Sequence, residues 1–232
     1  MKTMGVLGGL GPQATMAFED RVHRVAQRLV PQHANAGYPP MVVYYFRDLP
    51  ALMPADGSIP TQRPPANPAL LDAAHRLGSW ADFLVIPSNG VHAWQPEIED
   101  AAGRPVVSMI DATMAEVGRR GYRRVGVVDF RPPAWCIYTE PLRAAGIRTE
   151  VVPAEHLLAL QQAIHAVDEG RVDPAGRMLV QACMRDLRAQ QVDGILLACT
   201  ELPLLLDVAD LGPDVLDPID YLAEAAVRYA VA

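Results

Sequence analysis

Lysine is almost absent from this sequence of 232 residues, because Lys2 is the only one and every other formally basic residue is an arginine. A catalytic Schiff base requires a lysine in the interior of a protein. Enzymes that use pyridoxal phosphate hold the cofactor through such a lysine. The composition therefore argues against both kinds of chemistry.

Cysteine is also scarce, with Cys136, Cys183 and Cys199 as the three examples. Their number is odd and their spacing is wide, which fits neither a disulfide framework nor a CxxC metal site. Free thiols of this kind are typical of a reducing compartment. We expect Cys183 and Cys136 to pack in the interior, and we expect no metal.

Long apolar runs and basic blocks are missing as well. Half of the residues are apolar, yet no run approaches the roughly 18–20 residues that cross a bilayer. The short apolar run at the start is followed by glycines and lacks the features of a signal peptide, so we expect a cytoplasmic protein with no membrane partner. The net charge of −7 without a basic block disfavours nucleic acid as a partner.

Short apolar runs alternate with segments of helical spacing along the whole chain. This alternation predicts an α/β fold with mostly parallel sheets covered on both faces. The predicted strands lie at residues 4–7, 41–45, 83–86, 106–109, 125–128, 148–152, 195–198 and 215–216. The predicted helices lie at residues 12–29, 68–79, 110–120, 135–145, 155–169 and 174–190. The proline-rich stretch 49–68 is interpreted as a long surface loop.

The layout of the chain suggests two similar lobes. "GRRGYRRVGVVDF" restarts the turn and strand pattern near the middle, and "RPVVSMIDAT" is similar in layout to "DVLDPIDYLAEAA" near the end. We expect a first lobe of residues 1–112 and 213–232 and a second lobe of residues 113–212. Asp111 and Asp217 follow strands in similar settings, and helix capping is their simplest role.

The strongest chemical signal follows the strand predicted at 195–198. Cys199, Thr200 and Glu201 end a buried apolar run with three polar or ionisable groups. A thiol at a strand tip beside a helix N-terminus is expected to have a pKa below the free value of about 8.5. Cys199 is therefore the candidate base or nucleophile, although many cysteines in such runs only fill a core.

A partner cluster follows the strand predicted at 83–86. Ser88, Asn89 and Gly90 occupy its tip, and His92 falls in the next turn. Asn89 can donate to a carboxylate or enolate oxygen, whereas Ser88 is a weak acid that is of use as a base only if His92 or water assists it. His92 can equally cap or pack.

A glycine-rich turn, "GGLGP", follows the first predicted strand and opens a helix. Gly9 lies within it, where free backbone N–H groups can bind a carboxylate or phosphate. A simple tight turn explains the glycines equally well. The spacing differs from the GxGxxG pattern of dinucleotide-binding proteins.

Taken together, these motifs resemble the aspartate/glutamate racemase family. "MKTMGVLGGLGP", "RDLP", "IPSNGVHAW", "RPVVSMID", "ACTEL" and "DPIDYLAEAAVRYA" occur in the order and spacing of that family, over nearly the whole chain. The resemblance implies two lobes with the active site in the cleft between them, a homodimer, no cofactor, and a small carboxylic acid or amino acid as substrate. It also implies two cysteines on opposite faces of that substrate, one from each lobe.

This chain departs from the family pattern at several positions. Ser88-Asn89-Gly90 stands where relatives commonly have Cys-Asn-Thr, so one of the two thiols is missing. The carboxylate-binding turn, usually Thr-x-Gly-Thr, is "DFRPP" here. The two places that bind a distal carboxylate in aspartate racemases correspond to Leu52 and approximately Asp168. Candidate replacement cations are Arg47, Arg63 and Arg131.

Three functional hypotheses remain open from the sequence. The first is an amino-acid racemase or epimerase in which Cys199 works opposite Ser88. The second is a one-cysteine decarboxylase or isomerase that acts through an enolate in the same cleft. The third is a non-catalytic homologue that binds a small acid. In each of them the substrate-binding candidates are Gly9, Asn89, Gly90, Thr200, Glu201, His92 and the three arginines.

Overall fold

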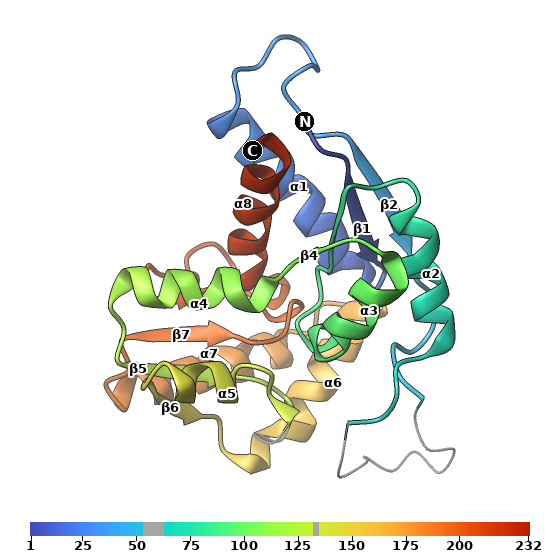
Figure 1. Ribbon diagram of the computed structural model, residues 1–232. Helices are drawn as coiled ribbons and strands as arrows, with labels where there is room; N and C mark the ends of the chain where they lie inside the picture. Colours follow the sequence, from blue (N-terminus) through green and yellow to red (C-terminus); the bar gives the residue numbers. More distant parts are fainter. Residues whose placement is uncertain (53–62, 132–134) are drawn as a thin grey trace. The chain divides into compact units, whose positions relative to one another are not determined.

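A computed structural model describes residues 1–52, 63–131 and 135–232 of the chain. These residues form two units, which we call unit 1 (Met1–Met109 with Leu222–Ala232) and unit 2 (Ile110–Tyr221). Each unit contains a four-stranded parallel sheet with helices beside it (Figure 1). The predicted fold class is therefore confirmed. Part of the predicted loop 49–68, residues 53–62, lies outside the described ranges.

In unit 1 the strand order is β2-β1-β3-β4. The strands are β1 (Met4–Gly8), β2 (Met41–Tyr45), β3 (Phe83–Val85) and β4 (Val106–Val107). The helices are α1 (Pro12–Leu29), α2 (Pro68–Gly78) and α3 (Gln95–Ala102). On one face of the sheet, Leu70 of α2 and Ile98 of α3 pack with Leu84 of β3. Adjacent strand residues point to opposite faces, and Phe83 contacts Tyr229 at the C-terminal end of the chain.

In unit 2 the strand order is β6-β5-β7-β8. The strands are β5 (Arg124–Val128), β6 (Arg148–Val151), β7 (Gly194–Leu197) and β8 (Val215–Leu216). The helices are α4 (Met109–Arg120), α5 (Thr139–Ala144), α6 (Leu157–Asp168), α7 (Pro174–Ala189) and α8 (Pro218–Val231), the last of which continues into unit 1. Residues of α6 and α7 cover one face of this sheet, and residues of α4 and α5 cover the other.

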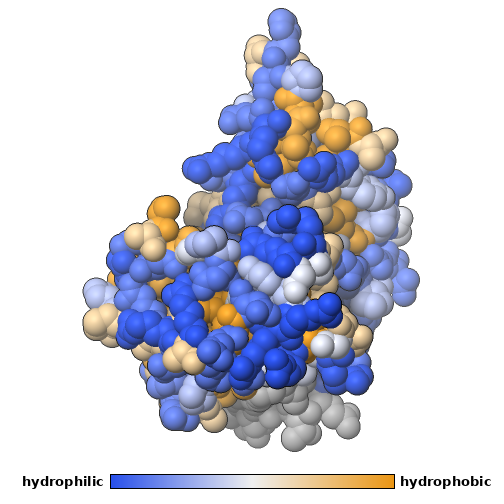
Figure 2. Space-filling view, turned by 90° about the vertical axis from the view of Figure 1, so that its left-hand side faces the viewer, coloured by the Kyte–Doolittle hydropathy of each residue, from blue (hydrophilic) through white to orange (hydrophobic). Residues whose placement is uncertain are grey.

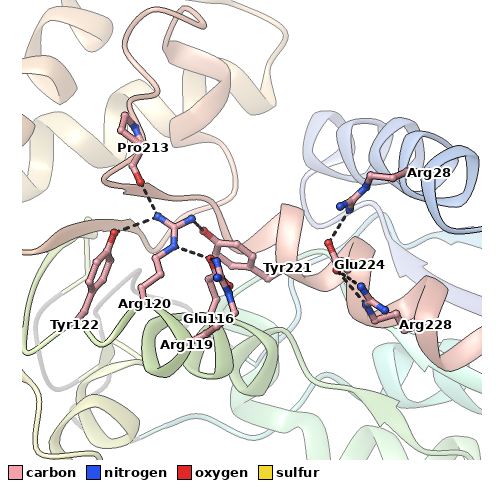
Figure 3. Close-up of polar contacts among 9 residues, drawn as sticks. All are labelled: Arg28, Glu116, Arg119, Arg120, Tyr122, Pro213, Tyr221, Glu224 and Arg228. Carbon is pink, nitrogen blue, oxygen red and sulfur yellow. Dashed lines mark hydrogen bonds and ion pairs between the residues drawn. The ribbon is translucent and has the colours of Figure 1, made fainter.

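The division between the units differs from the predicted lobes, because residues 213–221 belong to unit 2. Strand β8 pairs with β7, which places this segment in the second sheet. Arg120 then binds it directly, with Nη1 donating to the Pro213 carbonyl at 2.6 Å and Nη2 to the Tyr221 hydroxyl at 3.2 Å (Figure 3). Residues 110–112 join unit 2 as well, since they lie in α4.

The C-terminal part of α8 is held in unit 1 by a second polar network. Glu224 accepts hydrogen bonds from Arg28 of α1 at 2.7 Å and from Arg228, one turn further along α8, at 2.7 Å (Figure 3). The boundary between the units therefore falls within a single helix, between Tyr221 and Leu222.

The structure departs from the predicted elements mainly at three places. The strand predicted at 106–109 ends at residue 107, because Met109 already begins α4. The helix predicted at 135–145 starts only at Thr139. Helix α3 was not predicted; it has eight residues with acidic and apolar positions mixed, which gives a weak periodic signal.

The face in Figure 2 is dominated by hydrophilic residues, with apolar residues in separate smaller areas. Within the described ranges, no helix is both long and apolar enough to span a bilayer.

Candidate active site

The turn after β3 presents Ser88 and Asn89, and both are buried. Gly90 begins the 3₁₀ helix η1 (Gly90–Trp94), and the His92 amide donates to the Asn89 carbonyl at 3.2 Å. The polar side chains of this cluster therefore sit at the carboxyl end of a central parallel strand. Ligands of open α/β sheets bind at such ends.

His92 links the backbone of this turn to the backbone at the start of α4. The amide of Met109 donates to His92 Nε2 at 3.0 Å, so Nε2 is an acceptor. The hydrogen of a neutral imidazole must then be on Nδ1, which lies 2.9 Å from the Ser88 carbonyl and donates to it. Because both ring nitrogens are engaged by the backbone, a proton relay from Ser88 through His92 is inconsistent with the structure. The residue orients the Ser88 turn instead.

The glycine-rich turn after β1 is explained by backbone geometry. Gly9 has a φ of +85°, and a Cβ atom there would lie 2.4 Å from the Phe46 carbonyl oxygen. Only glycine fits such a position. The Gly9 amide donates to Thr15 Oγ1 at 2.9 Å, and that hydroxyl donates to the Gly11 carbonyl at 3.0 Å. The tight turn thus uses the Gly9 N–H group internally.

The end of β7 carries the second cluster, in which Cys199 and Glu201 form a buried pair. The Cys199 thiol donates to Glu201 Oε2 at 3.0 Å. The hydroxyl of Thr200 lies 3.1 Å from each oxygen of the same carboxylate and donates to it. Cys199 is only 7% exposed and Glu201 only 4%. The carboxylate is therefore the acceptor for both neighbouring side chains.

Burial raises the pKa of the Cys199 thiol well above its ordinary value, and the Glu201 carboxylate raises it further. The guanidinium of Arg131 lowers it in part. The expected low pKa is therefore wrong. The physical reasons are that the thiol is buried and that the neighbouring Glu201 carboxylate is negative, while the following helix, η4 (Leu202–Leu205), is only one short 3₁₀ turn. In its resting state Cys199 is a thiol.

Arg131 is the candidate arginine that lies near this cluster. Its Nε donates to Asp129 Oδ1 at 2.9 Å and its Nη2 to the Ala198 carbonyl at 2.9 Å. The backbone amide of Arg131 also donates to Asp129 Oδ1, at 3.0 Å. The residue thus links the end of β5 to the end of β7, directly before Cys199. Pro132 and Pro133 of the same predicted loop lie outside the described residues.

The other two candidate arginines are on the surface of unit 1. Arg63 forms an ion pair with Glu97 at 2.8 Å, and both side chains are more than a third exposed. The Arg47 guanidinium lies over the Tyr45 ring, 4.9 Å from its centroid. Each of the three arginines thus has a protein partner of its own.

Asp168 ends α6 on the same unit as Cys199. Its pKa is raised to about 7, by partial burial first and by the Glu201 carboxylate second. Asp168 therefore interacts electrostatically with Glu201, and it is not a cation that could bind a distal carboxylate. Among the described residues, no three His, Cys, Asp or Glu side chains are grouped as metal ligands.

The two clusters occupy equivalent places in their sheets. In chain order, both units arrange their strands as second, first, third, fourth. Ser88 lies three residues after Val85, the last residue of β3 paired with β4, and Cys199 lies three residues after Leu196, the last residue of β7 paired with β8. The hydroxyl and the thiol are therefore topological counterparts.

Sequence reasoning found both clusters but missed two roles. It did not single out Asp129, although an acidic residue two positions before an arginine at the end of a buried strand is a usable signal. It also did not pair the Cys199 thiol with Glu201. The capping role expected for Asp217 is confirmed, since its Oδ1 accepts from the Ile219 amide at the start of α8. The buried, core position of Cys183 is confirmed too.

Comparison with known proteins now defines the class. The Asp/Glu/Hydantoin racemase family model matches residues 7–226, and the chain belongs to that family. The amino-acid sequence of this chain is 28% identical to that of the broad specificity amino-acid racemase RacX of Bacillus subtilis (strain 168), over 99% of this chain and 98% of that protein.

Solved structures share the fold. An aspartate racemase homologue from Pyrococcus horikoshii OT3 matches with a TM-score of 0.76 and 21% identity, over 100% of both chains. The aspartate racemase of Picrophilus torridus matches with a TM-score of 0.70 and 21% identity, over 100% of this chain and 95% of that chain.

Proposed function

We propose that this protein is a cofactor-independent amino-acid racemase or epimerase in which Cys199 abstracts the α-proton and Ser88 stands on the opposite face of the substrate. The observation that carries the proposal is the buried hydrogen bond from Cys199 to Glu201 at the sheet position that corresponds to Ser88. Membership of the racemase family and the similarity to RacX support it.

The proposed reaction begins with a proton transfer within unit 2. Cys199 gives its thiol proton to Glu201, and the resulting thiolate removes the α-proton of the substrate. Because the carbanion places charge on the substrate carboxylate, donors such as Asn89 and Thr200 stabilise it. Ser88, or a water molecule that it holds, returns a proton on the other face. Exchange with solvent then removes the proton from Glu201 and restores the proton on the Ser88 side. A hydroxyl is a much weaker acid than a thiol, so the rates in the two directions differ strongly.

The remaining candidate residues support the site in this proposal. Gly9 allows the tight turn after β1, Gly90 begins η1 directly after Asn89, and His92 orients Ser88 through its carbonyl. Arg131 acts on the Cys199 sulfur and lowers its pKa. Arg47 lies over the Tyr45 ring and Arg63 forms an ion pair with Glu97. These contacts have to break before either guanidinium binds the substrate.

Exchange of the α-proton in heavy water, followed by NMR over a panel of L- and D-amino acids, tests the proposal. The wild-type protein is expected to exchange the α-proton of at least one of them, and Cys199→Ser is expected to lose that exchange by at least a thousandfold. Cys183→Ala is the matched control, because Cys183 is a buried thiol of the hydrophobic core. Exchange that survives Cys199→Ser would refute the proposal.

One observation favours a second candidate. A thiol that rests in its protonated form is suited to protonating an enolate on one face, which is the step that a one-cysteine decarboxylase needs. Release of carbon dioxide from a substituted malonate, without α-proton exchange on any amino acid, would establish this alternative. Tight binding of a small acid without either reaction would instead identify a non-catalytic binding protein.

Assembly as a homodimer and a cytoplasmic location are also proposed, on the resemblance to the family. Light scattering of the purified chain over a range of concentrations measures its oligomeric state. A monomer at all concentrations would contradict the first of these proposals.

A further inference from the structure

Asp129 and Arg131 form a buried ion pair at the carboxyl end of β5. Arg131 Nε donates to Asp129 Oδ1 at 2.9 Å, and the backbone amide of Arg131 donates to the same oxygen at 3.0 Å. The Asp129 side chain is only 4% exposed and that of Arg131 only 16%. Charge-assisted hydrogen bonds of this kind are strong and directional. Asp129 therefore fixes where the Arg131 guanidinium lies.

The guanidinium also binds the backbone directly before Cys199. Arg131 Nη2 donates to the Ala198 carbonyl at 2.9 Å. The Ala198 amide donates to the Val128 carbonyl at 2.9 Å. Both backbone polar groups of Ala198 are thus bonded to the end of β5. This arrangement places the Arg131 charge beside the Cys199 sulfur, where it favours the thiolate over the thiol.

A cavity of about 240 Å³ borders the ion pair at the carboxyl ends of β5 and β6. Its described wall includes Asp129 and Arg131 together with aliphatic side chains such as Val127 and Val152. One water molecule takes up about 30 Å³ in the liquid, so this space gives a long side chain room to change its rotamer. Packing alone therefore does not keep the guanidinium beside Cys199. The hydrogen bonds to Asp129 and to the Ala198 carbonyl do.

Four ionisable groups act on the Cys199 thiol or on its acceptor. Glu201 accepts from the thiol, and Asp129 and Arg131 act on the sulfur from the end of β5. Asp168 of α6 acts on Glu201. Under the proposed function, on which this step rests, transfer of the thiol proton to Glu201 moves the negative charge from the carboxylate to the sulfur. Arg131 is the cation of this group, so its position decides how stable the thiolate is.

We propose that Asp129 is a positioning residue of the reaction, which holds the Arg131 guanidinium at the end of β7, where the cation stabilises the Cys199 thiolate that removes the α-proton. In this role Asp129 acts only through Arg131 and does not touch the substrate. A purely electrostatic role has the opposite consequence, because the negative charge of Asp129 by itself disfavours a thiolate. The two roles therefore differ in the direction in which the pKa of Cys199 moves when Asp129 is removed.

Asp129→Ala tests this direction in the full chain. The pKa of Cys199 is expected to rise, because the released guanidinium turns away from the sulfur, and α-proton exchange is expected to slow about tenfold or more. The pKa is measured from the thiolate absorbance in a pH titration, with Cys199→Ala in the same background as the blank. Asp186→Ala is the matched control, since it removes an exposed carboxylate of unit 2 that is not among the groups that shift the Cys199 pKa. A lower or unchanged pKa in Asp129→Ala would overturn the inference.

Variants of Arg131 provide a background in which the expected direction reverses. In Arg131→Met there is no guanidinium to hold, so the further change Asp129→Ala is expected to lower the pKa of Cys199 through the loss of a negative charge. Shifts in the same direction in both backgrounds would overturn the positioning role. Arg131→Lys keeps a cation and is expected to recover part of the exchange rate that Arg131→Met loses. Equal losses in Arg131→Lys and Arg131→Met would overturn the role assigned to the charge.

Asp129→Glu provides a milder variant, which keeps the charge and moves the carboxylate by one methylene group. It is expected to raise the pKa of Cys199 as well, whereas an unchanged pKa in a variant that is folded by circular dichroism would contradict the positioning role. The titrations need no substrate, so their outcome is separate from that of the proposed function. The expected shifts without α-proton exchange on any amino acid would keep the link between Asp129 and the thiol and refute the racemase. Exchange with the opposite shifts would keep the racemase and refute the link.

Discussion

Replacement of Glu201 by Gln is expected to lower the pKa of Cys199, because it removes the negative charge beside the thiol. The carboxylate charge is shared by two oxygens, the nearer of which lies 3.0 Å from the sulfur. A unit charge at about 4 Å and an effective dielectric constant near 20 contributes about 4 kcal/mol to the preference for the protonated thiol. Arg131 remains and continues to lower the pKa. Burial also remains, so the thiol does not reach an ordinary value.

The pKa is measured from the ultraviolet absorbance of the thiolate during a pH titration, with Cys199→Ala in each background as the blank. Glu169→Gln serves as the control, because Glu169 is an exposed carboxylate of the same unit and is not among the groups that shift the Cys199 pKa. Turnover is expected to fall in Glu201→Gln despite the larger thiolate fraction, since the acceptor for the thiol proton is lost. An unchanged or higher Cys199 pKa would refute a charged carboxylate beside the sulfur, and faster turnover would refute its role as acceptor.

The remaining predictions concern the other cluster and the packing of α4. Ser88→Cys is expected to raise the rate of racemisation in its slower direction at least tenfold, measured by polarimetry starting from each enantiomer. No gain in rate in either direction would count against Ser88 as the counterpart of Cys199. His92→Phe is expected to cost about 2–4 kcal/mol in the free energy of unfolding, measured with urea, because two buried backbone groups lose their partners; a change below about 0.5 kcal/mol would contradict the assigned bonds. Arg120→Met is expected to cost about 2–4 kcal/mol by the same assay, since four groups lose their donor. Arg119→Met is expected to change the stability much less, because the Arg119 side chain is 71% exposed. Hydrogen bonds from Arg119 and Arg120 lower the pKa of Glu116 to about 2, so its contribution to stability is full above the unfolded value of about 4.5 and is lost as the pH falls toward 2; in Glu116→Gln this part of the acid dependence is expected to disappear.

Most of the fold was predictable because the chain alternates strongly. Each of the eight predicted strands has a counterpart in the structure, and the bounds of α1 match the predicted residues 12–29. The misses have local causes. Helix α3 is short. The strand β4 ends at residue 107 because Met109 already begins α4, where its amide donates to His92 Nε2.

The two clusters were also predictable, since polar groups after a buried strand are visible in the sequence. Their electrostatics were not. The sign of the Cys199 pKa shift depends on how deeply the thiol is buried and on which charge lies nearest, and neither follows from residue order. The division of the chain at residue 221 depends on the pairing of β8 with β7, which joins segments far apart in sequence.

By itself, the sequence determined the alternating α/β pattern, the thiol of Cys199 after one strand, the hydroxyl of Ser88 after another and the lack of interior lysine. These properties are local or compositional. Only the tertiary structure decided that both nitrogens of His92 bind backbone, that burial and the Glu201 carboxylate raise the pKa of Cys199, and that Arg131 links Asp129 to the Ala198 carbonyl. The physical reason is that hydrogen-bond partners and local dielectric are set by groups brought together in space.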